Sequence, residues 1–114
     1  MKLLTKANLK ALPPLYSNEN VADPIAVVKF FDPTGSWTWY ATEAGGITED
    51  GADVPLADPA TVDVRFFGLV DGFEEELGYF TLSELQSARG RLGLGIERDR
   101  HFPPTPLSQL RRAS

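Results

Sequence analysis

The chain has 114 residues, no cysteine and a formal net charge of −5. Its length predicts one domain over residues 1–114, large enough for a modest hydrophobic core. The missing cysteine excludes disulfides and thiolate metal ligands, and it suits a reducing compartment. No apolar stretch reaches the roughly 18 residues of a membrane span. We therefore expect a soluble, cytoplasmic protein that has no membrane partner.

Charge is distributed unevenly along the chain. Residues 19–84 contain 14 acidic residues against Lys29 and Arg65, a net charge of −12. From residue 85 onward six arginines face Glu97 and Asp99, a net charge of +4. One interpretation is a solvated acidic surface that keeps the protein soluble. The other is a surface that repels nucleic acid and attracts a basic protein; direct nucleic-acid binding is disfavoured because no concentrated basic patch is present.

The first half of the chain predicts a short helix followed by a β-hairpin. Thr5 suits the N-cap of a helix that runs through residue 12 and ends before Pro13-Pro14. Residues 24–31 and 37–42 are rich in β-branched and aromatic side chains, which favours two strands. Between them Asp32-Pro33-Thr34-Gly35 predicts a turn in which glycine supplies a left-handed position.

A long acidic loop is expected over residues 43–61, which are rich in Gly, Asp, Pro and Ala and lack periodicity. The loop carries Glu49, Asp50, Asp53 and Asp58. Their spacing does not match the alternating oxygen ligands of a calcium loop, which favours a solvated acidic loop over the alternative of a structural ion. We therefore expect no metal, and we expect no cofactor. The loop is predicted to be mobile.

Residues 62–79 predict a second hairpin, closed by Asp71-Gly72 as a two-residue type I′ turn. That turn sets a register in which Val70 faces Phe73, Phe66 faces Leu77 and Val64 faces Tyr79. These residues would form an apolar face against a core, with Glu74 and Glu76 on the other face.

The last third of the chain predicts two short helices. Thr81 and Glu84 form a capping-box pattern for a helix over residues 82–89, with Gly90 at its C′ position. Residues 92–96 are apolar but interrupted by glycine, either an edge strand or an extended packing segment. Thr105-Pro106 suits the start of a last helix. The fold class is α+β, an antiparallel sheet of two hairpins with short helices packed on one face.

The sequence resembles a bacterial domain of unknown function, numbered two-nine-five-eight, that is met on plasmids, conjugative elements and phages. The matching stretches cover nearly the whole chain and are residues 12–17, 24–31, 35–43, 66–70, 76–80 and 93–99. The chain departs from the family pattern in a longer loop between residues 43 and 63, and in Gly95 where proline is expected. The resemblance brings no catalytic residues. It implies an accessory gene of a mobile element, a setting in which anti-defence proteins are frequent.

Candidate catalytic groups are few. His101 is the sole histidine, and no serine lies in a nucleophile-elbow sequence. Glu74 and Glu76 are two residues apart on one strand, about 7 Å, which overlaps the spacing of glycosidase carboxylates but is common to any strand with acids at this spacing. We therefore expect no enzymatic activity; the alternative is a small hydrolase that uses Glu74, Glu76 or His101.

Trp37 and Trp39 share one face of their predicted strand, and Tyr40 points to the other. Such residues either belong to a core or, on an open face, form an interface hot spot. We expect an interaction protein that inhibits a host defence complex (anti-CRISPR or anti-restriction) by presenting acids to a basic partner. The alternative is a module of plasmid transfer or maintenance. The predicted partner-binding residues are Glu74, Glu75, Glu76, Glu49, Asp50, Asp53, Trp37, Trp39 and Tyr40.

Overall fold

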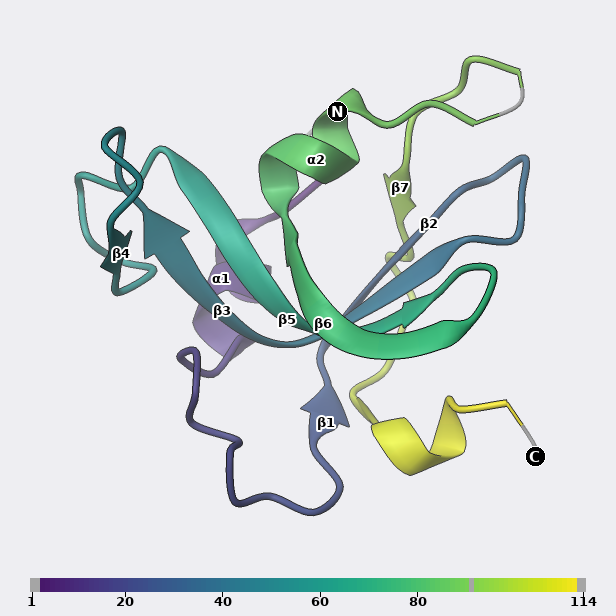
Figure 1. The fold of residues 1–114 in the computed structure, drawn as a ribbon, viewed down its shortest axis with the longest axis horizontal. Coiled ribbons are helices and arrows are strands. Elements are labelled where there is room, and N and C mark those ends of the chain that lie inside the picture. Colours follow the sequence, from purple (N-terminus) through teal and green to yellow (C-terminus); the bar gives the residue numbers. More distant parts are fainter. Residues whose placement is uncertain (1–2, 91, 113–114) are drawn as a thin grey trace.

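The computed structural model describes residues 3–90 and 92–112, which form a curved antiparallel sheet with short helices (Figure 1). The main sheet has six strands, in the order β6-β5-β3-β2-β7 with β4 paired to β3, and β1 and β8 form a second sheet. The strands are β1 (Ile25–Ala26), β2 (Val28–Phe31), β3 (Thr38–Ile47), β4 (Asp53–Val54), β5 (Asp63–Asp71), β6 (Glu75–Thr81), β7 (Glu97–Arg98) and β8 (Thr105–Pro106). The helices are α1 (Lys6–Ala11), α2 (Leu82–Ser87) and the 3₁₀ turn η1 (Leu107–Gln109). The predicted combination of antiparallel strands and short helices is confirmed, although the sheet arrangement differs.

The first predicted hairpin is confirmed as β2 and β3, with Phe30 opposite Trp39. The Asp32 carboxylate closes its turn by accepting hydrogen bonds from the Thr34 amide (2.9 Å) and hydroxyl (3.0 Å). The predicted left-handed glycine is wrong, because Gly35 does not have a positive φ. A Cβ there would lie 2.7 Å from Asp32 Oδ2. Glycine at this position leaves room for the carboxylate.

The predicted loop over residues 43–61 is partly wrong, because β3 continues to Ile47. Its last part is made of small residues, which are buried and so show no alternation in the sequence. A Cβ on Gly46 would lie 3.0 Å from Thr61 Cγ2 and 3.1 Å from the Pro55 carbonyl oxygen. After Ile47 the chain turns, adds β4 to the edge of β3 and enters β5.

The predicted register of the second hairpin is wrong. Asp71 pairs with Glu75 and Phe66 with Phe80, so the connection is residues 72–74 rather than Asp71-Gly72. Gly72 lacks the positive φ that a type I′ turn requires. A Cβ on it would lie 2.5 Å from the Trp37 ring, so the glycine makes room for tryptophan.

The observed register differs from the predicted one by an odd number of residues, which exchanges the two faces of β6. Leu77 and Tyr79, predicted for the core, instead pair with Leu69 and Phe67 on the opposite face and are 48% and 51% exposed. Phe80 takes the core position and stacks on Phe66 with ring centroids 5.2 Å apart. The gain in buried aromatic area explains why this register prevails over the one favoured by the turn sequence.

Two of the three predicted helix N-caps, Thr5 and Thr81, are confirmed. Thr5 accepts a hydrogen bond from the Asn8 amide before α1, and Thr81 accepts one from the Glu84 amide before α2, each at 3.2 Å. The side chains of Asn8 and Glu84 bond back to the cap residues, which completes a capping box at each helix. These local signals are read directly from the sequence.

The predicted ends of the later helices are wrong. α2 ends at Ser87, and Gly90 is not a left-handed C′ residue. A Cβ on Gly90 would lie 2.9 Å from the Asp32 carboxylate carbon, so glycine allows close packing on the first turn. Residues 105–106 pair with β1 as a strand, and a 3₁₀ turn follows in place of the predicted helix.

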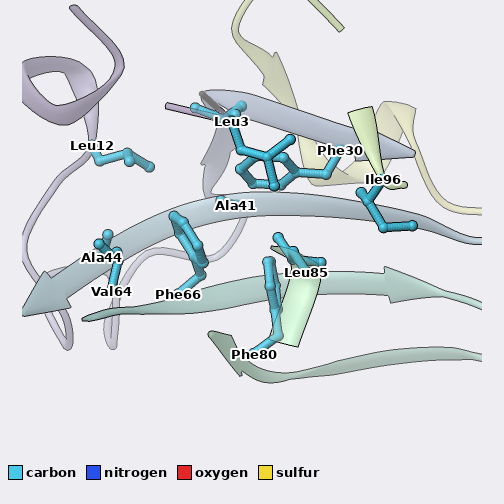
Figure 2. Close-up of a cluster of buried hydrophobic side chains, with 11 residues drawn as sticks. Leu3, Leu12, Phe30, Ala41, Ala44, Val64, Phe66, Phe80, Leu85 and Ile96 are labelled. Carbon is cyan, nitrogen blue, oxygen red and sulfur yellow. The ribbon is translucent and has the colours of Figure 1, made fainter. Parts of the chain in front are cut away.

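Hydrophobic side chains are buried on both faces of the main sheet. One cluster lies under α2 and centres on Phe66, whose ring is 5.4 Å from Phe30 (Figure 2). Its members are Leu3, Leu12, Val28, Phe30, Ala41, Ala44, Val64, Phe66, Phe80, Leu85 and Ile96. A smaller cluster of Ala26, Leu69 and Leu107 lies on the opposite face. The prediction of helices on one face therefore fails for η1, which covers the second face.

Candidate functional site

A pocket of about 540 Å³ opens on the sheet face that carries Phe67, Leu77 and Tyr79. Its floor is formed by β3, β5 and β6, and its sides are residues 16–24 and residues 107–111. In Figure 1 these sides are the dark connection between α1 and β1 and the yellow C-terminal turn. The pocket therefore joins segments that are distant in the sequence.

A β-bulge in β3 shapes the floor of this pocket. The register with β5 shifts at Thr42, the extra residue before Glu43. Thr42 is buried and donates its hydroxyl to the Phe67 carbonyl (3.0 Å). Gly68 makes the bulge possible, because a Cβ there would lie 2.8 Å from the Tyr40 carbonyl carbon and closer still to its oxygen. Both Thr42 and Glu43 line the pocket as a result.

The Glu43 carboxylate lies at the floor, and this residue is only 4% exposed. Its Oε2 accepts a hydrogen bond from the Asn18 amide (2.6 Å), and the Asn18 side chain donates to the Thr42 carbonyl (3.4 Å). None of the ion pairs within residues 3–90 and 92–112 involves Glu43. Buried carboxylates are normally paired with a cation, so this one is unusual.

Aromatic rings form the walls next to Glu43. The rings of Phe67 and Tyr79 meet edge to face with centroids 5.0 Å apart, and Tyr16 also lines the pocket. Tyr16 has φ 71°, a left-handed conformation that costs a non-glycine residue about 1–3 kcal/mol. Partial desolvation, then the Tyr16 phenol and the charges of Glu43 and Glu19, raise the pKa of Tyr79.

The rim of the pocket is fixed by Asp23. Its carboxylate accepts hydrogen bonds from the Ser108 amide (2.9 Å) and hydroxyl (2.6 Å), which lower the pKa of Asp23. The Leu107 amide donates to the Pro24 carbonyl (3.0 Å). These bonds attach the C-terminal turn to the segment before β1. Arg111 lies exposed at the same rim.

A second surface, which we call the hairpin tip, consists of Trp37, Val70, Phe73, Glu74 and Glu76 around a hollow of about 260 Å³. The Phe73 ring meets the Trp37 ring edge to face at 5.4 Å and is 89% exposed. Trp37 also lies 5.9 Å from Trp39, which packs against the larger core cluster. The structure thus brings together Glu74, Glu76 and the two predicted tryptophans.

Two other predicted binding residues make contacts with other parts of the same chain. Glu75 accepts a hydrogen bond from the Arg112 amide (2.7 Å), and the Arg112 guanidinium pairs with Asp71. Tyr40 packs against Phe102 on the smaller core cluster, with ring centroids 5.9 Å apart. Neither Glu75 nor Tyr40 lines the hollow of the hairpin tip beside Glu74 and Glu76.

The loop acids lie at the other end of the sheet. β4 is at the left of Figure 1, whereas the β5–β6 turn is at the right. Glu49 and Asp50 are exposed beside β4, and Asp53 pairs with the Arg65 guanidinium (3.1 Å). These acids and the hairpin tip do not form one patch.

The groups considered for catalysis are also separated. His101 is exposed and lines a different hollow, together with Lys29 and Arg98, from the one lined by Glu74 and Glu76. In the described part of the chain, no three His, Asp or Glu side chains are grouped as metal ligands. The hydrolase alternative needs either Glu74 with Glu76, which share the hollow of the hairpin tip, or His101, and it stays a prediction.

The sequence reasoning missed the Glu43 pocket. The sequence predicts a loop at Glu43 and core positions for Leu77 and Tyr79, because local patterns reveal neither the bulge nor the hairpin register. A usable signal was the β-rich run over residues 38–42, which continues through Glu43 into buried small residues.

Comparison with known proteins gives one result about identity. No curated protein and no solved structure matches the chain. Within the described residues no helix is long and apolar enough to cross a membrane. A family model described as "Protein of unknown function (DUF2958)" matches residues 3–114, which include all the stretches that carry the resemblance. The chain belongs to this family.

Proposed function

We propose that the chain is a non-enzymatic interaction protein that binds a basic protein surface through its hairpin tip. The observation that carries this proposal is Phe73, which is 89% exposed next to Trp37 and between acidic residues. Exposed aromatic residues backed by a second ring are typical anchors of protein interfaces. Glu74 and Glu76, both exposed, surround this anchor with negative charge.

Charge complementarity points to a basic partner. Residues 19–84 have a net charge of −12, and their two basic residues are paired, Lys29 with Asp99 (3.9 Å) and Arg65 with Asp53 (3.1 Å). Such a field repels nucleic acid and accelerates association with a cationic surface. Proteins that bind nucleic acid present such surfaces to phosphates. Carboxylates of the hairpin tip can take the place of those phosphates.

The family resemblance suggests the setting. Mobile elements meet host defence complexes that hold nucleic acid in basic channels, so we propose that a CRISPR or restriction complex in the cytoplasm is the target. The competing proposal is a module of plasmid transfer or maintenance whose acidic surface only maintains solubility. Phe73 favours the first, because solubility is served by charge and opposed by an exposed aromatic ring.

A matched pair of charge reversals tests the proposal. Glu74→Lys with Glu76→Lys alters the hairpin tip, and Glu49→Lys with Asp50→Lys makes the same change in net charge near β4. Each variant is expressed in a host with an active defence system, which is then challenged with a targeted plasmid or phage. We expect the tip variant alone to lose protection and the salt-sensitive binding of the defence complex.

Two outcomes would contradict the proposal. If the tip variant protects as well as the wild type, the hairpin tip is not the docking surface. If both variants lose protection equally, net charge rather than the hairpin tip is responsible. Circular dichroism of both variants confirms that each remains folded.

A further inference from the structure

The Glu43 pocket lies on the opposite face of the sheet from Trp39 and so is separate from the hairpin tip. Glu43 is only 4% exposed, and its Oε2 accepts a hydrogen bond from the Asn18 amide. Among the described residues, Oε1 accepts no hydrogen bond. It is also absent from the fully buried polar atoms that lack a partner, so it must be accessible from outside the protein. Oε1 therefore opens into the pocket.

We propose that this pocket binds an organic cation, a primary ammonium on an aliphatic chain. The ammonium would lie against the Glu43 carboxylate, which has no cationic partner among the described residues. Tyr16 and Tyr79 line the same pocket, and the faces of tyrosine rings attract a cation. A volume of about 540 Å³ is within the range of small-molecule pockets.

Other ligand classes fit the pocket less well. An anion would be repelled by Glu43 and by Glu19 and Asp23 at the rim. Among the described residues that line the pocket, Arg111 is the only cationic one. A divalent metal needs several oxygen ligands, and no group of such ligands is found in residues 3–90 and 92–112. A neutral apolar ligand would leave the buried charge uncompensated.

The ammonium can come from a free amine or from a lysine side chain, and two probes distinguish these sources. n-Butylammonium represents the free amine, and Nα-acetyl-lysine methylamide represents the side chain. Their neutral counterparts, 1-butanol and Nα-acetyl-norleucine methylamide, have similar carbon chains without the charge. The Asn18 amide, which donates to Glu43, reports binding in ¹⁵N–¹H correlation spectra of the labelled protein.

Glu43→Gln is the decisive variant, because glutamine keeps an acceptor for Asn18 and removes the charge. We expect at least one ammonium probe to bind the wild type with a dissociation constant near 1 mM, on the order of −4 kcal/mol. Glu43→Gln should weaken binding at least about tenfold, as expected for loss of a charged hydrogen-bond partner. Glu76→Gln, on the hairpin tip, should bind as the wild type does.

Thermal melting separates loss of binding from loss of folding. Removing an unpaired buried charge should leave the melting temperature of Glu43→Gln equal to or above that of the wild type. If that variant fails to fold, Tyr79→Leu replaces it, since Tyr79 is half exposed; loss of the ring face should weaken binding about threefold.

The probe that binds more tightly identifies the source of the ammonium, and either result supports the proposal. Three results would overturn it. The first is that neither ammonium probe has a dissociation constant below about 10 mM. The second is that the neutral counterparts bind as tightly as the ammonium probes. The third is that the Glu43→Gln or Tyr79→Leu variant binds the probe as tightly as the wild type does.

Discussion

Replacing Gly68 by alanine should destabilise the protein, whereas the same change at Gly78 should not. The two glycines face each other across β5 and β6, so they form a matched pair. A Cβ on Gly68 would lie 2.8 Å from the Tyr40 carbonyl carbon, closer still to its oxygen, and 3.1 Å from Ala41 Cα. Around Gly78 no heavy atom of the described residues lies within 4 Å of the same position.

The expected magnitude follows from these neighbours. They are backbone atoms that cannot rotate away, so β3 must separate from β5 at the bulge. Overpacking typically costs 1–3 kcal/mol, and we expect Gly68→Ala near the upper end, at about 3 kcal/mol. For a domain of this size that lowers the melting temperature by roughly 12 °C. Gly78→Ala should stabilise by about 0.5 kcal/mol, because alanine restricts the unfolded chain.

Urea denaturation followed by circular dichroism measures both changes, with similar m-values showing that the unfolding transition is comparable. The packing account of the bulge would be refuted if Gly68→Ala stayed within about 0.5 kcal/mol of the wild type. Equal destabilisation at Gly78 would also refute it, because a Cβ there has no close neighbour and a cause other than close approach would then be needed.

Three further predictions test the core, a helix cap and the pocket rim. Phe66→Ala, at a fully buried position, should lower the free energy of unfolding by about 3–5 kcal/mol in urea denaturation. Thr81→Ala removes the N-cap of α2 and should cost about 1 kcal/mol in the same assay. Ser108→Ala removes the main cause of the lowered pKa of Asp23. The ionised carboxylate stabilises the fold, so wild type should have a larger free energy of unfolding than Ser108→Ala near neutral pH. That difference should shrink as the pH falls below about 4, where the carboxylate becomes protonated.

Signals within a few residues were predictable from the sequence. Thr5 and Thr81 cap their helices as expected, since an N-cap depends on residues three positions away. The turn after β2 also forms where the Asp-Pro-Thr-Gly sequence places it. In each case the hydrogen-bonding partners are close along the chain.

Features set by distant contacts were not predictable. Gly72 suggested a tight turn, but Trp37, far from it in sequence, packs where its side chain would be. Pairing of Phe66 with Phe80 then decides the register and moves Tyr79 to the pocket face. The same limit hid Glu43, because its surroundings combine β3, the segment after α1 and the C-terminal turn.

The central claim, that Phe73 anchors a protein partner, is tested most directly by Phe73→Ala in the plasmid or phage challenge. Leu92→Ala is the matched control, since Phe73 and Leu92 are 89% and 78% exposed and neither change should unfold the protein. Loss of an interface hot spot costs at least about 2 kcal/mol, roughly a 30-fold weaker complex. We expect Phe73→Ala to lose protection while Leu92→Ala retains it; full protection by Phe73→Ala would contradict the account.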